Sequence, residues 1–263
     1  MIENNDLLLK VCNIAIKAGE EILKYYKDDI EVTHKDDSSP LTKADLASNK
    51  IILNALNELD RTIPILSEES LVEWNQRKNW TTYWLVDPLD GTKEFIEGIP
   101  QFVVSVGLVE NGKPVVGILH NPVTNETFCA SHGFGSFLND ERFEVTKKDS
   151  IKEMTILNSR SENRKGLWDP FKNSFKKLKP IGSVAYKMGI TAVGKADVFA
   201  TLRPKNEWDV CAGVCLINEA GGKSINLNGQ ELEFNKEKTL IEPGIIAGYN
   251  LSVDKVYKVL NGG

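Results

Sequence analysis

The sequence predicts a mixed protein with an α+β first half and an α/β second half. In the first half, apolar runs typical of strands follow one another through short turns, which favours an antiparallel sheet. In the second half, strand and helix patterns alternate, as in α/β proteins. A polar break at residues 147–150 separates the two patterns. We therefore expect two domains, residues 1–148 and 149–263.

Two amphipathic helices are expected near the start of the chain. The first spans residues 5–26, where apolar residues recur at helical spacing, namely Leu8, Val11, Ala15, Ala18 and Ile22. The second spans residues 41–59 and has one apolar side made of Leu46, Ile52, Leu53, Leu56 and Leu59. Thr42 and Asp45 have the spacing of a capping box at the start of this second helix.

The remaining elements follow from shorter patterns. Strands of the first half are expected at 63–66, 83–86, 102–110, 114–120, 126–131 and 136–145. The Asn111-Gly112 pair joins the third and fourth of these and is a strong signal for a β-hairpin. The second half is expected to contain strand 154–157, helix 183–194, strand 196–202, helix 208–220, strand 244–249 and helix 253–260.

Composition and charge narrow the class of protein. A hydrophobic content of 41% and a charged content of 26% are typical of a soluble globular chain. The net charge of −5, without any basic tract, counts against a nucleic acid polymer as partner. No apolar run approaches the length of a membrane span, and the polar N-terminus does not resemble a signal peptide. We therefore expect no stable membrane insertion and a cytoplasmic location.

Cysteine and histidine usage limits the chemistry. The four cysteines form no Cys-x-x-Cys pair, which favours reduced core cysteines over disulfides or a zinc site. The three histidines lack the spacing of a metal-binding pair, and the Gly-x-Ser-x-Gly signature of a serine nucleophile is absent. We therefore expect chemistry that depends on carboxylates, hydroxyls and a metal ion.

The clearest functional signal is the segment 84–93, Trp-Leu-Val-Asp-Pro-Leu-Asp-Gly-Thr-Lys. Asp87 and Asp90 come directly after an apolar strand, and Gly91 lets the backbone approach a ligand closely. Residues 93–98 can open a short helix whose first N–H groups are free to meet an anion. Carboxylates beside such N–H groups suggest a divalent cation that bridges protein and phosphate. Taken alone, Asp-Pro and Asp-Gly pairs are equally consistent with a surface turn.

Other acids stand at the ends of predicted elements. Glu68 and Glu69 follow the 63–66 strand, although a solvated acidic loop is the ordinary interpretation of such a pair. Asp209 starts an apolar helix, where an acid also interacts favourably with the helix dipole. Asp45 is explained equally well by helix capping.

Together these acids resemble the motifs of the inositol monophosphatase superfamily of Mg²⁺-dependent phosphatases. The matching segments are Ser-Glu-Glu-Ser at 67–70, Asp-Pro-Leu-Asp-Gly-Thr at 87–92 and Glu-Trp-Asp-Val-Cys-Ala-Gly at 207–213. Segments 90–96, 158–161 and 182–187 are most similar to the 3′(2′),5′-bisphosphate nucleotidase branch. The resemblance implies a fold of alternating helix and sheet layers, with an active site between the two halves.

The resemblance also implies roles for individual residues. The metal ligands for two or three Mg²⁺ ions are Glu68, Asp87, the backbone carbonyl of Leu89, Asp90 and Asp209. The catalytic group consists of Asp45 and Thr92, which take the proton of the attacking water, together with Glu68. Substrate contacts are expected from the N–H groups of Gly91 and Thr92, and from Arg160, Ser183, Lys187 and Asp209. A solvated helix lysine and a surface ion pair are the ordinary alternatives for Lys187 and Arg160.

The implied reaction is removal of the 3′-phosphate of adenosine 3′,5′-bisphosphate, giving AMP and phosphate, which would clear a by-product of sulfate assimilation. Inositol monophosphate or fructose 1,6-bisphosphate as substrate, and a non-catalytic module that binds metal or phosphate, are alternatives. Glu162 departs from the branch, which usually carries a substrate-binding histidine there. An added negative charge is a poor neighbour for a bisphosphate.

Trp208 and Phe95 are expected to pack in the core behind the acidic motifs. The protein is expected to be a monomer or a homodimer.

Overall fold

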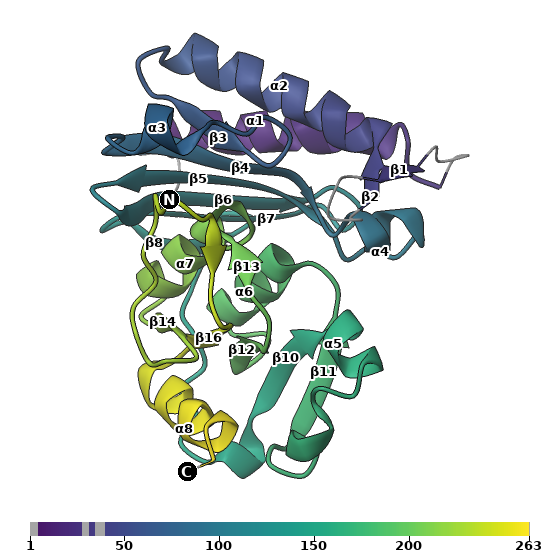
Figure 1. The fold of residues 1–263 in the computed structure, drawn as a ribbon, viewed down its shortest axis with the longest axis vertical. Coiled ribbons are helices and arrows are strands. Elements are labelled where there is room, and N and C mark those ends of the chain that lie inside the picture. Colours follow the sequence, from purple (N-terminus) through teal and green to yellow (C-terminus); the bar gives the residue numbers. More distant parts are fainter. Residues whose placement is uncertain (1–4, 28–31, 35–39, 263) are drawn as a thin grey trace.

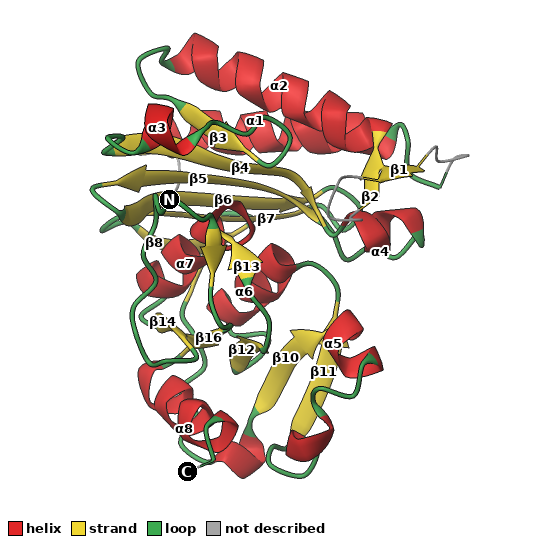
Figure 2. Cartoon of the chain, in the orientation of Figure 1, coloured by secondary structure: helices red, strands yellow, loops and turns green. Residues whose placement is uncertain are grey.

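Two β-sheets form the body of the protein, and helices cover both faces of each (Figure 1). The computed structural model describes residues 5–27, 32–34 and 40–262. In Figure 2 the layers follow one another from top to bottom as helix, sheet, helix, sheet and helix. The layered fold implied by the sequence motifs is therefore present.

The first sheet contains, in spatial order, β3 (Ile65–Ser67), β4 (Thr82–Asp90), β5 (Val103–Glu110), β6 (Lys113–Asn121), β7 (Glu126–Ser131), β8 (Gly135–Leu138) and β9 (Glu141–Phe143). The β3–β4 pair is parallel and every other pair is antiparallel. The hairpin predicted at Asn111-Gly112 is confirmed. Both residues have positive φ, as a type I′ turn requires.

The second sheet is mixed and contains, in spatial order, β11 (Lys177–Ile181), β10 (Thr155–Ser159), β12 (Val198–Thr201), β16 (Ile245–Gly248) and β14 (Lys223–Asn226). Two small sheets pair β1 (Val32–His34) with β2 (Pro40–Thr42) and β13 (Lys205–Asn206) with β15 (Leu240–Ile241). Short 3₁₀ helices lie at Ile151–Glu153 and Asp169–Phe171.

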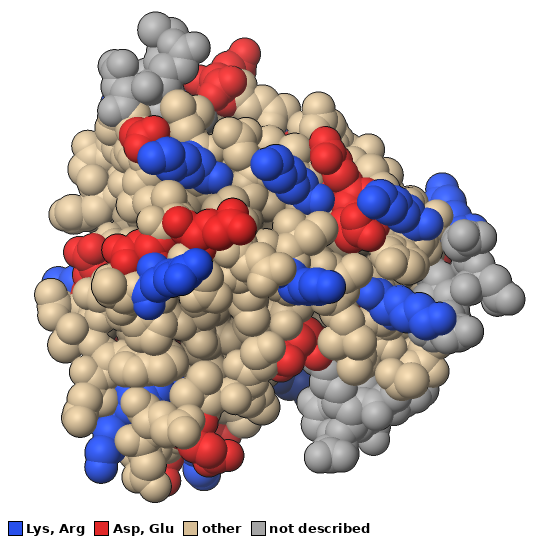
Figure 3. Space-filling model, turned by 90° about the horizontal axis from the view of Figure 1, so that it is seen from above, with Lys and Arg blue, Asp and Glu red and all other residues tan. Residues whose placement is uncertain are grey.

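The helices are α1 (Asp6–Leu23), α2 (Lys43–Leu59), α3 (Trp74–Arg77), α4 (Thr92–Ile96), α5 (Arg160–Arg164), α6 (Val184–Ala192), α7 (Glu207–Glu219) and α8 (Asn250–Leu260). Helices α1 and α2 cover the outer face of the first sheet, α6 and α7 lie between the sheets, and α8 covers the second sheet (Figure 1). Within the described ranges, no helix has both the length and the apolar composition that crossing a bilayer requires. Figure 3 shows basic and acidic side chains interspersed over the face seen from above.

The packing of strand β4 explains why residues 83–86 are apolar at every position. Trp84 and Val86 point into the core under α1 and α2, whereas Tyr83 and Leu85 belong to the core around α6 and α7. Since successive side chains of a strand point to opposite faces, a sheet covered on both sides needs a continuous apolar run. The strand is longer than the predicted 83–86, so Asp87 and Asp90 lie within its last residues, where the register with β5 shifts.

Several expectations need correction. The second helix begins at Lys43 rather than residue 41, because Pro40–Thr42 pairs as strand β2. Its buried face carries the polar residues Asp45, Ser48 and Asn49 as well as apolar ones, and this rotation leaves Leu46 half exposed. The predicted strand 136–145 is two strands, since Asn139 and Asp140 form a turn with positive φ between them.

The sequence pattern missed β11 and α5, which lie in a polar stretch without clear periodicity. The proposed domain boundary near residue 148 lies between the last strand of the first sheet and the first strand of the second. One continuous core nevertheless contains residues from both sides of it. The division into two domains stays a prediction.

Two glycines let α7 pack unusually close to the first sheet. Gly107 and Gly117 are paired on adjacent strands β5 and β6. A Cβ atom on Gly117 would lie 2.4 Å from the carbonyl oxygen of Ala212, and one on Gly107 would lie 2.5 Å from the Sγ of Cys211. Both obstacles belong to α7, so the helix and the sheet meet backbone to backbone at this point. This contact fixes the distance between the first sheet and α7, whose first turn carries Asp209.

We predict that Gly117→Ala lowers the free energy of unfolding by about 1–3 kcal/mol, because the added methyl group has to push a helix backbone away from the sheet. Gly189→Ala in α6 is the matched control. Its Cβ would lie 3.1 Å or more from the side chains of Leu119 and Phe128, which can shift, so we expect a small effect. Urea denaturation of the two variants measures the difference, and equal destabilisation would contradict the close-contact explanation.

Candidate active site

The parallel pairing of β3 and β4 brings two acidic segments together. Ser67 lies opposite Val86, and the N–H of Glu68 donates to the carbonyl of Val86 at 3.0 Å. Because parallel strands end at the same edge of a sheet, Glu68 emerges beside Asp87. Asp87 is buried, and its Oδ1 accepts the N–H of Leu89 at 3.0 Å, which folds the Asp-Pro-Leu-Asp turn tightly. The first two acids of the predicted set are thus neighbours.

Gly91 makes the sharp turn from β4 into α4. Its φ of 104° lies in the region that favours glycine, and a Cβ there would lie 2.8 Å from the carbonyl oxygen of Gln101. The turn presents the start of α4, where Thr92 is the first helical residue, to the same side as the acids. The first N–H groups of a helix have no acceptor within it, so they are available to an anion.

Helix α7 delivers the last acid of the set. Asp209 lies in its first turn, and its Oδ2 accepts the N–H of Asn206 at 3.1 Å. The carbonyl of Trp208 accepts a hydrogen bond from Ser105 of β5 at 3.3 Å, which joins this turn to the first sheet.

All the predicted metal ligands line one pocket of about 300 Å³: Glu68, Asp87, Leu89, Asp90 and Asp209. Gly91, Thr92, Arg160, Ser183 and Lys187, expected to contact the substrate, line the same pocket. Segments that are far apart in the sequence are therefore gathered as the motifs predicted.

The carboxylates of this pocket oppose one another electrostatically. Burial raises the pKa of Asp87 well above its usual range, and the charges of Glu68, Asp90 and Asp209 raise it further. Burial, with Asp90 and Glu68, likewise raises the pKa of Asp209 well above normal, against a smaller lowering by Lys205. Such a cluster favours uptake of protons or of a cation.

Asp90 is held by the segment that precedes α6. Its Oδ2 accepts hydrogen bonds from the Ser183 hydroxyl at 2.5 Å and from the N–H of Ala185 at 2.6 Å. Burial raises the pKa of Asp90, while these bonds lower it in part. Ser183 adopts φ of 52°, which is uncommon for a residue with a side chain. In this arrangement Ser183 is bonded to Asp90, which differs from the substrate contact expected of it.

Lys187 is also used differently from the expectation. Its ammonium is buried and donates to the carbonyl of Ile181 at 3.0 Å, to that of Gly182 at 3.2 Å and to that of Ser183. Burial lowers the pKa of Lys187 to about 8. The Lys187 ammonium is thus bonded to the backbone of the turn that holds Asp90, so the structure does not present it as a free phosphate-binding group.

Arg160 forms the ion pairs that were the ordinary alternative for it. Its Nη1 lies 2.7 Å from Oε1 of Glu94, and its Nη2 lies 2.7 Å from Oε2 of Glu97. These pairs join α5 to α4 across the pocket. The side chain stays 23% exposed, so its outer surface still lines the pocket.

Asp45 and Thr92 come together as the resemblance implied. The Thr92 hydroxyl donates to Oδ1 of Asp45 at 3.1 Å and also lies 3.2 Å from the carbonyl of Leu89. The other carboxylate oxygen accepts the N–H and the hydroxyl of Thr42, so the capping box is confirmed as well. Burial raises the pKa of Asp45. The Asp45 carboxylate therefore caps the start of α2 through Thr42 and also accepts a hydrogen bond from Thr92.

Two polar residues of α2 that were not predicted to belong to the site support it. The Ser48 hydroxyl donates to the carbonyl of Pro88 at 2.8 Å, and the Asn49 Oδ1 accepts from the Ser67 hydroxyl at 2.7 Å. Together with Asp45 they lie three and four residues apart, which is the spacing of one helix face. That polar stripe at helical spacing was the signal available in the sequence.

Glu162 does not act as the sequence suggested. Its carboxylate is buried and accepts hydrogen bonds from Trp168 Nε1 at 2.9 Å, Thr201 Oγ1 at 2.5 Å and the N–H of Leu202 at 3.2 Å. It is not among the residues that line the pocket. The expected conflict with a bisphosphate is therefore wrong, because the charge belongs to the interior of the second half.

Basic side chains form the rim of the pocket beside the acids. Lys93, Arg164 and Lys205 line it together with Arg160. Lys93, Arg164 and Lys205 were not among the predicted site residues, although Lys93 and Lys205 directly adjoin the Gly-Thr and Asn-Glu-Trp-Asp segments. Carboxylates at the floor and cations at the rim match a divalent ion bound to an anionic ester.

The donor set consists of carboxylate and carbonyl oxygens, which are the ligands that Mg²⁺ prefers. Over the described ranges, no group of three or more His, Cys, Asp or Glu side chains is arranged to hold a metal ion as it stands. The donor chemistry and the charge of the pocket therefore fit a hard divalent ion, and the carboxylates have to adjust to enclose it.

Comparison with known proteins agrees with this site. A model of the inositol monophosphatase family matches residues 4–258. The 3′(2′),5′-bisphosphate nucleotidase CysQ of Aggregatibacter actinomycetemcomitans is 33% identical over 250 residues, which cover 92% of each chain. The solved structure of the extragenic suppressor protein suhB from Bartonella henselae has a TM-score of 0.85 at 28% identity, covering 98% of this chain and 99% of its own. CysQ from Bacteroides thetaiotaomicron has a TM-score of 0.76 at 32% identity, covering 92% and 96%.

These matches span nearly the whole chain, so the layered fold and the motifs have a common origin rather than a chance likeness. Known members of this family are metal-dependent phosphatases. The resemblance to the nucleotidase branch is confirmed as well, since relatives with that name share about a third of the sequence. The chain belongs to the inositol monophosphatase family and is a phosphatase.

Proposed function

We propose that the protein is a Mg²⁺-dependent phosphomonoesterase that hydrolyses the 3′-phosphate of adenosine 3′,5′-bisphosphate to give AMP and phosphate. The observation that carries the proposal is the gathering of four carboxylates and Thr92, whose hydroxyl is bonded to Asp45, around one pocket with a basic rim. The name of the CysQ relatives supports the choice of a bisphosphate. Glu162, whose negative charge counted against a bisphosphate substrate, lies in the interior and does not line the pocket.

Two or three Mg²⁺ ions would be held by Glu68, Asp87, the carbonyl of Leu89, Asp90 and Asp209. When bound, Mg²⁺ lowers the pKa of a bound water and stabilises the charge of the phosphate and of the leaving oxygen. Because Asp87, Asp90 and Asp209 repel one another, a cation also relieves the electrostatic cost of gathering them. Removing any one of these carboxylates should weaken metal binding.

Asp45 and Thr92 would take up the proton of the attacking water. The Thr92 hydroxyl already donates to Asp45, so it can accept a proton on its own oxygen while it passes one to the carboxylate. Thr42 holds the second oxygen of Asp45, which fixes the orientation of the carboxylate. Proton transfer would thus follow hydrogen bonds that are already formed.

The substrate would lie between the acids and the basic rim. The N–H groups of Gly91 and Thr92 would hold oxygens of the transferred phosphate, and Asp209 would contact the ester from the first turn of α7. Arg160 would contact the second phosphate with the surface that its ion pairs leave exposed. Ser183 and Lys187 would act through the turn that holds Asp90, which revises the direct contacts first expected of them.

Phosphate release from a panel of esters tests this function. We expect adenosine 3′,5′-bisphosphate to give a higher kcat/KM than inositol 1-phosphate and fructose 1,6-bisphosphate, and we expect EDTA to abolish release from all three. A higher kcat/KM for inositol 1-phosphate would leave the phosphomonoesterase reaction in place and overturn adenosine 3′,5′-bisphosphate as the substrate. Release that is indifferent to EDTA would overturn the metal dependence.

Thr92→Ala should lower kcat by about 10²-fold or more with little change in KM, since it removes a proton-transfer group rather than a substrate contact. Thr92→Ser retains the hydroxyl and is the matched control, for which we expect kcat within about tenfold of the wild type. Steady-state kinetics at saturating Mg²⁺ measure both. The proton-relay role would be excluded by an alanine variant as active as the serine variant.

Asp87→Asn should inactivate the enzyme and yet stabilise the metal-free protein at neutral pH. The pKa of Asp87 is raised in the folded state, so folding becomes less favourable as pH rises from the unfolded pKa through the folded one. The asparagine variant lacks this titration. In EDTA, the melting temperature of the variant should exceed that of the wild type by a margin that grows from about pH 5 to about pH 8. Where the variant is more stable by about 1 kcal/mol, this margin should be at least ~2 °C. An advantage that is constant with pH would contradict this electrostatic account.

A further inference from the structure

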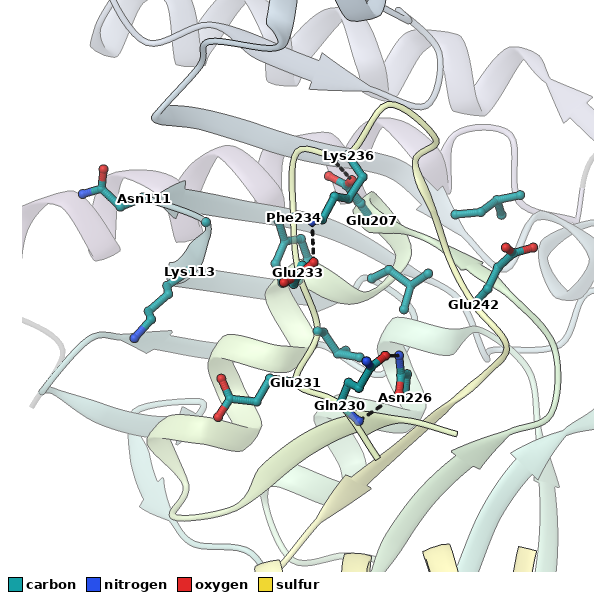
Figure 4. Close-up of a pocket in the computed structure, with 14 residues that line it drawn as sticks. Asn111, Lys113, Glu207, Asn226, Gln230, Glu231, Glu233, Phe234, Lys236 and Glu242 are labelled. Carbon is teal, nitrogen blue, oxygen red and sulfur yellow. Dashed lines mark hydrogen bonds and ion pairs between the residues drawn. The ribbon is translucent and has the colours of Figure 1, made fainter. Parts of the chain in front are cut away.

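A polar network lies beside the first turn of α7, outside the pocket that the metal-binding acids line. It contains Glu207, Asn235 and Arg77, none of which lines the acidic pocket. Instead, Glu207 lines a second cavity of about 570 Å³ together with the loop 230–236. Figure 4 shows this cavity, with Glu207 directed toward the loop that carries Phe234 and Lys236.

Glu207 joins the start of α7 to that loop. Its side chain is 1% exposed, and its two carboxylate oxygens accept the N–H groups of Asn235 and Lys236, each at 2.9 Å. Its own N–H donates to the carbonyl of Thr239 at 2.8 Å. A buried carboxylate with both oxygens bonded is held firmly, and Glu207 is two residues before Asp209 in the same helical turn.

Asn235 carries the connection onward to Arg77. Its Oδ1 accepts from Arg77 Nη1 at 3.1 Å, and its Nδ2 donates to the carbonyls of Arg77 at 3.0 Å and Trp80 at 3.1 Å. Arg77 Nη2 donates to the carbonyl of Glu237 at 2.9 Å. The guanidinium is thus bonded twice to the loop that Glu207 holds.

Arg77 joins the loop to the segment that follows β3. It is 2% exposed, and its Nε donates to the carbonyl of Val72 at 3.2 Å. Val72 belongs to the segment that leaves β3 through Glu68. The network therefore joins the segment after Glu68 to the helix turn that carries Asp209, although these acids come from opposite halves of the sequence.

We propose that Arg77, Asn235 and Glu207 form a brace that fixes the separation of Glu68 and Asp209, and that they are positioning residues for divalent metal binding. The inference rests on the proposed metal site. Its physical reason is that Arg77 bonds both Val72 and the loop 235–237, and this loop bonds Glu207, so the two segments have little freedom to move apart. The connection lies outside the acidic pocket, so it can hold the separation of Glu68 and Asp209 without placing any atom against the ion.

Asn235→Gly tests the brace in the full-length protein. Glycine keeps the φ of 60° at this position and the backbone N–H that donates to Glu207, so only the side-chain bonds to Arg77 and Trp80 are lost. Asn139→Gly is the matched control. That asparagine also has positive φ and two side-chain bonds, to Thr127 and Asn125, but it lies in the β8–β9 turn and does not line the pocket.

The measurement is the Mg²⁺ concentration at which the melting temperature of metal-free protein rises half-way. Both variants should melt below the wild type in EDTA. Only Asn235→Gly should raise the Mg²⁺ midpoint, by about tenfold, which is the lower end of the losses seen when groups behind metal ligands are removed. At saturating Mg²⁺ its kcat should return to within about threefold of the wild type, as expected of a residue that acts through metal binding.

Glu207→Gln provides a second, milder change, since the amide keeps one acceptor oxygen and offers an amino group where the second acceptor was. We expect a smaller shift of the Mg²⁺ midpoint in the same direction. Unchanged midpoints in both brace variants, with melting temperatures lowered as in Asn139→Gly, would overturn the brace alone. A wild type whose melting temperature does not respond to Mg²⁺ would overturn the metal site and the brace together, whatever ester is hydrolysed.

Discussion

Like-charge repulsion inside a single pocket is the constraint on which the rest of this structure depends. Burial and mutual repulsion raise the pKa values of Asp87, Asp90 and Asp209, so gathering them opposes folding. The fold meets this cost with rigid supports, and the charges of Lys187 and Lys205 also lower the pKa values of Asp90 and Asp209 in part. Each acid is attached to an element that is fixed by packing elsewhere.

The supports are of three kinds. Parallel pairing of β3 with β4 fixes the segment of Glu68 beside Asp87 by backbone register alone. The turn before α6 fixes Asp90 through Ser183 and a buried ammonium. The glycine contact between β5, β6 and α7 fixes the helix whose first turn carries Asp209. None of these supports depends on a flexible surface loop, so the geometry of the site is a property of the layers themselves.

Much of this arrangement could be predicted from the sequence, for physical reasons that differ between elements. The β4 run is apolar on both faces and the Asn111-Gly112 turn needs positive φ, so both patterns are local and strong. The acids could be assigned to one pocket only through their combined order, because each alone has an ordinary explanation. The contacts of Lys187, Ser183 and Glu162 could not be predicted, since their partners are backbone groups and side chains brought near by tertiary packing. The rotation of α2 that exposes Leu46 depended in the same way on polar neighbours beneath the helix.

The interior position of Glu162 bears on any attempt to change substrate preference at this point of the chain. The resemblance to the nucleotidase branch implied a substrate-binding histidine there, but in this protein Glu162 accepts hydrogen bonds from Trp168 and Thr201 inside the second half. A histidine in its place would face an indole N–H and a hydroxyl rather than the pocket, so the exchange would deprive buried donors of their acceptor instead of adding a ligand for the substrate.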